Sequence, residues 1–135
     1  IKNKIINLID ESYNSNPLSL KMALLNYNKI KFHQGKKHII LGDMLELGHH
    51  SIKQHQLISK IINKIDIDKV HVIGKDIKKT YENLTKNKKG IILSNLSEII
   101  DLINNNLDNN DYLMIKGSNS TGLYSTVNNL KHKKI

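Results

Sequence analysis

The segment His38–Gly48, HIILGDMLELG, decides the fold class. It begins with the β-branched apolar run of a buried strand and passes through Gly42 into an acidic loop. Runs of the same kind alternate with stretches of helical period elsewhere along the chain, at Lys4–Ile9, Lys69–Ile73, Gly90–Leu93 and Tyr112–Ile115. This alternation predicts an α/β fold with a mainly parallel sheet flanked by helices.

Apolar residues between these strands recur on single helical faces, which should cover the sheet. The two faces consist of Ile58, Ile61, Ile62 and Ile65, and of Leu96, Ile99, Ile100, Ile103 and Leu107. The first helix should begin at Pro17 with Asn16 as its N-cap, because proline has no N–H to lose at the first helical position. Leu18, Met22 and Leu25 then share a face, and Ser51 and Ser120 are further candidate N-caps.

Length and composition indicate one domain spanning residues 1–135. The net charge of +9 comes from 21 lysines without any arginine, and one Phe and no Trp are present for base stacking. These features disfavour nucleic acid as a partner and favour a solvated lysine surface. No cysteine, bilayer-spanning stretch or signal peptide is found, so a cytoplasmic location without membrane insertion is expected. The start at Ile1 suggests the interior of a longer polypeptide.

Polar segments follow three of the predicted strands. They are Asp10–Pro17, Gly42–Gly48 and Lys116–Gly122. Because ligands gather at the carboxyl ends of parallel strands, these segments should converge in space. Each also has a simpler interpretation as a turn that caps the next helix or packs against it.

The three segments suggest different chemistry. The first offers carboxylates, amides and Tyr13 for a ribose and a base. In the second, Asp43 and Glu46 suit an amine or the water around Mg²⁺. The third sets Lys116 at a helix start, where an anion is favoured.

Two kinds of site are disfavoured by spacing. The nearby histidines lack a zinc-binding spacing and are expected to cap a helix or lie on the surface; they are His49, His50 and His55. Neither a P-loop nor a dinucleotide fingerprint occurs, so phosphates of ATP would need another domain.

Taken in order, the motifs DESYNSNP (residues 10–17), LGDMLELG (41–48) and KGS (116–118) resemble the C-terminal domain of the Mur ligase family. They are most similar to the members that add D-alanyl-D-alanine, whose patterns are D-D-S-Y-N-A-N-P, L-G-D-M-x-E-L-G and K-G-S-R-S. The resemblance covers essentially the whole chain. Departures are Glu11 for Asp, Ser15 for Ala and Asn119 for Arg.

The resemblance implies a Rossmann-like lid domain of a three-domain, ATP-dependent ligase of peptidoglycan precursor synthesis. The P-loop, the Mg²⁺ ligands and the catalytic residues would belong to the central domain, so no catalytic or metal-binding residue is expected here. Its partners would be the central and N-terminal domains, ATP, D-alanyl-D-alanine and a UDP-muramoyl tripeptide. Nucleotide contact is carried onto Asp10, Tyr13, Asn14 and Asn16. Contact with the acceptor or the closed site is carried onto Asp43, Glu46, Lys116 and Ser118.

Alternatives remain from two classes. Another Mur-type ligase or a folylpolyglutamate synthase would carry a histidine in the first motif, where this chain has Asn14 and Asn16. A non-catalytic receiver-like module would need an aspartate at the end of the third strand, where Ile73–Lys75 stands.

Overall fold

The computed structural model describes residues 4–31, 34–118 and 121–131. Five strands form one sheet, with every described pairing parallel. They are β1 (Asn7–Glu11), β2 (Lys37–Gly42), β3 (Lys69–Ile73), β4 (Lys89–Leu93) and β5 (Tyr112–Lys116), in the spatial order β1-β5-β2-β3-β4. The predicted α/β fold with a parallel sheet is confirmed.

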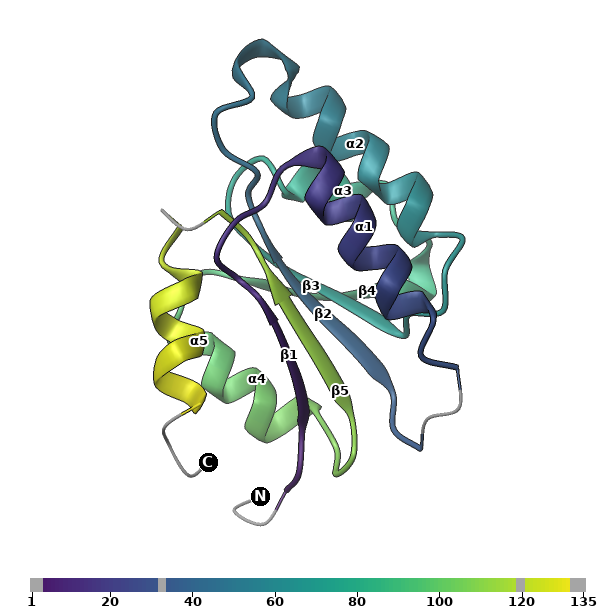
Figure 1. The fold of residues 1–135 in the computed structure, drawn as a ribbon, viewed down its shortest axis with the longest axis vertical. Helices are drawn as coiled ribbons and strands as arrows, with labels where there is room; N and C mark the ends of the chain where they lie inside the picture. Colours follow the sequence, from purple (N-terminus) through teal and green to yellow (C-terminus); the bar gives the residue numbers. More distant parts are fainter. Residues whose placement is uncertain (1–3, 32–33, 119–120, 132–135) are drawn as a thin grey trace.

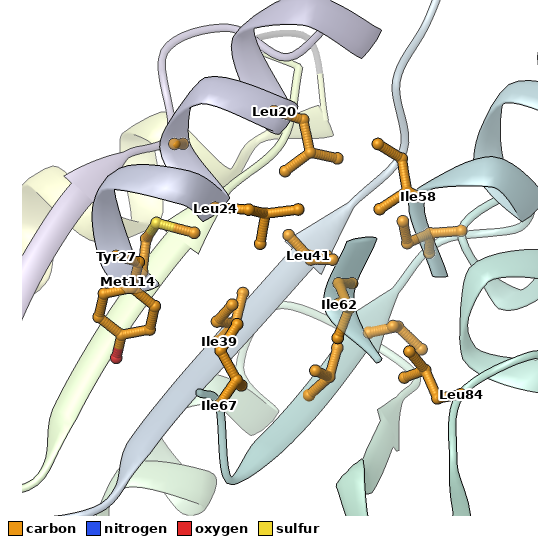
Figure 2. Packing of buried hydrophobic residues seen from close by; sticks show 14 of the residues in the cluster. Leu20, Leu24, Tyr27, Ile39, Leu41, Ile58, Ile62, Ile67, Leu84 and Met114 are labelled. Carbon is orange, nitrogen blue, oxygen red and sulfur yellow. The ribbon is translucent and has the colours of Figure 1, made fainter. Parts of the chain in front are cut away.

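Helices cover both faces of the sheet (Figure 1). One face carries α1 (Pro17–Asn28), α2 (Ser51–Ile62) and α3 (Lys78–Glu82), and the other carries α4 (Glu98–Asn106) and α5 (Leu123–Lys131). Alternate residues of β2 point to opposite faces, as a strand requires. Ile39 and Leu41 pack with α1 and α2, whereas Ile40 packs with α4 and α5. Figure 2 shows the first of these two cores.

Helix α1 begins as predicted but buries a different face. Asn16 Oδ1 accepts from the amide of Ser19 at 2.8 Å, and the Ser19 hydroxyl accepts from the amide of Asn16, which completes a capping box. The face formed by Leu18, Met22 and Leu25 is exposed, with Leu18 69% accessible. The buried side chains are instead Leu20, Ala23, Leu24 and Tyr27. The apolar residues of this helix lie on more than one of its faces, so periodicity alone does not show which face is buried.

The first strand lies later in the chain than predicted. Pairing with β5 begins at Asn7 and runs to Glu11, so the predicted span Lys4–Ile9 starts three residues too early and ends two too early. Lys4 serves another purpose, because its ammonium donates to carbonyls at the end of α4, including that of Asn104 at 2.9 Å. A sequence pattern does not show where the neighbouring strand begins.

Several lysines cap helices instead of lying in solvent. The fully buried Lys37 donates to the carbonyls of Tyr27, at 3.1 Å, and Ile30, at 2.8 Å, at the end of α1. Lys4 and Lys88 do the same at the ends of α4 and α2. Cations at helix C-termini satisfy free carbonyls and oppose the helix dipole. For these lysines the expectation of a solvated surface is wrong.

Candidate functional site at the carboxyl edge of the sheet

The three polar segments meet at the carboxyl edge of the sheet, as predicted. Ser118, just after β5, connects them: its amide donates to the Asp43 carbonyl at 3.1 Å, and its hydroxyl accepts from the amide of Leu45 at 3.0 Å. The same hydroxyl lies 3.3 Å from the carbonyl of Ser15, to which it donates. One side chain from the third segment therefore joins the first and the second. Asn119 and the candidate cap Ser120 lie outside the described residues.

Lys116 faces the first segment, not an open pocket. Its side chain is almost fully buried, and its ammonium donates to the carbonyl of Asn14 at 2.6 Å, with the Glu11 carboxylate 3.9 Å away. Burial lowers the pKa of Lys116, and the charge of Glu11 opposes that shift. In this geometry the lysine stabilises the loop after β1 through its hydrogen bond to that carbonyl.

Asp10 already holds partners on both carboxylate oxygens. Oδ1 accepts from the amide of Ser12 at 3.0 Å and from the Ser12 hydroxyl, while Oδ2 accepts from Lys131 at 2.5 Å. Burial acts to raise the pKa of Asp10, but the hydrogen bonds from Lys131 and Ser12 bring it below the ordinary value. A ribose hydroxyl reaching this carboxylate would displace Lys131, whose side chain is partly exposed.

The other residues predicted to bind the nucleotide differ in which side-chain groups are already engaged by the chain itself. Tyr13 is 64% exposed and packs edge-on against Tyr124 of α5, with ring centroids 5.2 Å apart. Asn14 Oδ1 accepts from the amide of Ser15, and Asn16 Oδ1 is used by the helix cap. The tyrosine pair therefore offers the open aromatic surface beside this loop, which suits stacking with a base.

In the second segment the side chain of Glu46 is exposed, whereas the carboxylate of Asp43 is hydrogen-bonded to the backbone. The Asp43 carboxylate accepts from the amides of Ile77, at 2.8 Å, and Lys75, at 3.2 Å, so it holds the turn after β3. Glu46 is exposed and has φ 64°, a left-handed conformation that costs a non-glycine residue about 1 kcal/mol or more. Its carboxylate is the one that this loop offers to a cationic ligand.

The three histidines separate into two groups. His49 and His50 lie exposed in the 3-10 turn Gly48–His50, in agreement with a surface position. His55 is fully buried, so the expectation of a surface or capping role is wrong for it. Ser51 is the first residue of α2 and not its N-cap, and its hydroxyl donates to Asp76 at 2.7 Å.

Two contributions come from the last helix and were not predicted. Tyr124 supplies the partner of Tyr13, and Lys131 supplies the partner of Asp10, across 121 residues of chain. No local pattern marks either residue, since both contacts depend on how α5 packs beside β1. Among the described residues, no three histidine or carboxylate side chains are grouped to hold a metal ion. No described helix has the length and apolarity that a membrane span requires.

Comparison with known proteins finds curated relatives that are named as ligases. A D-alanyl-D-alanine-adding ligase, UDP-N-acetylmuramoyl-tripeptide–D-alanyl-D-alanine ligase, of Buchnera aphidicola (subsp. Acyrthosiphon pisum) is 33% identical over 95% of this chain and 27% of the relative. The enzyme of that name from Bacillus subtilis is 30% identical over 93% of this chain and 28% of the relative. The chain therefore spans about a quarter of the length of these curated relatives.

Solved structures agree on the fold. MurF from Acinetobacter baumannii aligns with 98% of this chain, and 30% of its own, at a TM-score of 0.77 and 24% identity. MurF from Thermotoga maritima, in complex with ADP, aligns with 91% of this chain, and 27% of its own, at a TM-score of 0.74 and 18% identity. The family described as "Mur ligase, glutamate ligase domain" matches residues 1–119. With that match over most of its length, the chain belongs to the Mur ligase family, in its glutamate ligase domain.

Proposed function

We propose that residues 1–135 form the C-terminal lid domain of an ATP-dependent ligase that adds D-alanyl-D-alanine to UDP-N-acetylmuramoyl-tripeptide. The observation that carries this proposal is the convergence of the three motif segments on one edge of the sheet through Ser118. Relatives named for that reaction, at 29–33% identity, align with at least half of this chain and in most cases nine tenths of it. The reaction belongs to peptidoglycan precursor synthesis in the cytoplasm, and through it to cell shape and division.

The chemistry divides between domains. In the proposed reaction the γ-phosphoryl group of ATP passes to the tripeptide carboxylate, which releases ADP and forms an acyl phosphate. The amine of D-alanyl-D-alanine then attacks the acyl carbon, forming the amide and releasing phosphate. This chain has no P-loop, and both oxygens of Asp43 bind backbone amides. We therefore assign the phosphates, Mg²⁺ and the catalytic residues to the central domain.

The lid contributes binding and closure. We assign the nucleoside of ATP to the first segment, with Tyr13 offering its ring and Asn14 its amide, while Asn16 shapes the loop as a cap. Asp10 would accept from the ribose once Lys131 moves aside. Closing such a lid orients the reacting groups and keeps water from an acyl phosphate.

The acceptor is assigned to the second and third segments. Glu46 would receive the cationic end of the dipeptide before its amine is deprotonated for attack. Asp43, Lys116 and Ser118 would serve the closed site by holding the loops, because their polar atoms already bind other parts of the chain. Removing any of these three should then cost stability as well as activity.

Replacing Asp10 with alanine in the full-length ligase should raise the KM for ATP more than the KM for D-alanyl-D-alanine. One hydrogen bond to a charged group contributes about 1.5 to 3 kcal/mol, so an increase of roughly ten- to a hundredfold is expected. Steady-state kinetics with each substrate varied in turn measures both constants.

The matched control is Lys131→Met, which removes the partner of Asp10 and leaves the carboxylate in place. If Asp10 binds ATP, this variant keeps or lowers the KM for ATP. Equal increases in the two variants would mean that Asp10 only anchors α5, and the ribose assignment would be withdrawn.

A further inference from the structure

His55 lies behind the loop that carries Glu46. It belongs to α2 and is fully buried, so it does not reach a ligand itself. Its Nε2 atom lies 3.0 Å from the amide nitrogen of Met44, and its Nδ1 atom lies 2.7 Å from the carbonyl oxygen of Ser51. An amide N–H only donates, so Nε2 is the acceptor and the ring proton sits on Nδ1, which donates to Ser51. Both ring nitrogens are thereby committed.

The loop of residues 43–48 is held from two sides. His55 accepts from the amide of Met44, and Ser118 accepts from the next amide, that of Leu45. The side chain of Met44 is itself buried in the core. Two successive amides are thus received by side chains from different elements, immediately before Glu46.

Glu46 needs this support because its backbone is strained. A non-glycine residue with φ 64° keeps that conformation when its neighbours determine it. Its side chain is exposed. A change in the path of residues 44 and 45 would therefore move the carboxylate.

We infer that His55 is a positioning residue of the acceptor site, which acts through the Met44 amide to hold Glu46 toward the ammonium group of the acceptor. This inference rests on the proposed function, which assigns the dipeptide to this loop. The histidine contributes one tautomer with two fixed hydrogen bonds, one to the loop and one to its own helix. Its part is to keep the loop ready before the substrate arrives.

Two substitutions separate the two bonds. In His55→Gln, the amide group can occupy the place of Nε2 and accept from Met44, while the bond to Ser51 is lost. In His55→Asn, the amide group can occupy the place of Nδ1 and donate to Ser51, while the bond to Met44 is lost. The Gln variant gives up the contacts of Nδ1 with the carbonyl oxygen of Ser51 and with its hydroxyl, 3.2 Å away, whereas the Asn variant gives up only the bond to Met44. A purely structural role therefore predicts a loss in the Gln variant at least as large as that in the Asn variant.

Hydrogen exchange of the Met44 and Leu45 amides in this chain is the first measurement. The Asn variant should raise exchange at these amides about tenfold over the Gln variant, and the Gln variant should stay close to the parent. Equal exchange in the two variants would overturn the positioning role. The ¹⁵N spectrum of the parent gives a test that needs no variant: it should show His55 with its proton on Nδ1, and a proton on Nε2 would contradict the inference.

Kinetics of the full-length ligase is the second measurement. The Asn variant should raise the KM for D-alanyl-D-alanine about tenfold, with the KM for ATP and kcat changed by less than about twofold, and the Gln variant should restore it. If exchange responds as expected but the dipeptide KM does not, His55 holds the loop but the loop is not the acceptor site, and the inference fails. If the parent ligase does not use the dipeptide at all, the proposed function fails, and exchange still reports whether His55 holds the loop.

Discussion

Replacing Lys37 with methionine should lower the free energy of unfolding by about 3 kcal/mol, a large share of the stability of a small domain. The side chain of Lys37 is fully buried, and its ammonium lies 3.2 Å from the Asp66 carboxylate. It also donates to the carbonyls of Tyr27 and Ile30 at the end of α1. Methionine fills similar space but leaves these oxygens without their cation, which costs more than the lost bonds alone.

Lys21→Met is the matched control, because Lys21 is exposed on α1, the helix whose end Lys37 caps. It should change the free energy of unfolding by less than about 0.5 kcal/mol. Urea unfolding followed by circular dichroism measures both variants. A loss in Lys37→Met no larger than in the control would show that α1 does not depend on this buried cation.

Mild acid should destabilise the domain through a pair of buried histidines, His38 of β2 and His71 of β3. The amide of Ile91 donates to His71 Nδ1 at 2.9 Å, so the proton of His71 sits on Nε2, 3.0 Å from His38 Nδ1. That leaves the proton of His38 on Nε2, 3.3 Å from the Asp111 carboxylate. Both rings are therefore neutral and their protons point in one direction.

The pKa values of both rings agree with this arrangement. Burial, together with His38 and Lys69, lowers the pKa of His71 to about 3. Burial also lowers the pKa of His38, against the attraction of Asp111 and Asp68. Each histidine is free to bind a proton near pH 6.5 only after unfolding.

The sign of the effect follows from proton binding. Below about pH 6.5 the unfolded chain binds protons that the folded chain excludes. The free energy of unfolding therefore decreases as the pH is lowered, by up to about 1.4 kcal/mol per pH unit for each histidine. Between pH 6.5 and 5 the loss attributable to His71 should reach roughly 2 kcal/mol. It should continue toward pH 3, where the folded form also accepts the proton. Carboxylates with lowered pKa values, such as Asp10, act at lower pH and leave this window clear.

His71→Asn isolates this contribution. Asparagine can keep an acceptor for the amide of Ile91 but does not titrate, so the free energy of unfolding should fall less steeply between pH 6.5 and 5, by about one proton. Urea unfolding at several pH values measures the slope. An unchanged slope would mean that His71 is protonated in the folded domain.

One strand and one helix start were predicted to the residue because their signals are local. The run at Lys69–Ile73 is the observed β3, and Asn16 with Pro17 marks the start of α1 to the residue. The buried face of α1 was not predictable, since both Leu18 and Leu20 belong to plausible apolar faces. Local residues indicate that a helix forms, and tertiary packing chooses which side it buries.

In the candidate site, too, some features follow from the sequence and others depend on tertiary packing. Parallel topology brings the ends of β1, β2 and β5 to one edge, so the meeting of the three segments could be predicted. Which polar atoms remain free could not be predicted, because this depends on contacts between residues that are far apart in the sequence. Lys116 looked available to an anion and instead binds the carbonyl of Asn14, 102 residues away. Likewise, burial of His55 depends on the path of the loop at Met44.

Acceptor specificity of the full-length ligase that carries this chain tests the central claim most directly. With ATP and UDP-N-acetylmuramoyl-tripeptide present, phosphate release should require D-alanyl-D-alanine, whereas L-alanine, D-glutamate or a folate with L-glutamate should give none. The isolated chain should give none with any acceptor, because it lacks the P-loop. Turnover by the ligase with one of the other acceptors and not with the dipeptide, or turnover by the isolated chain, would contradict the assignment.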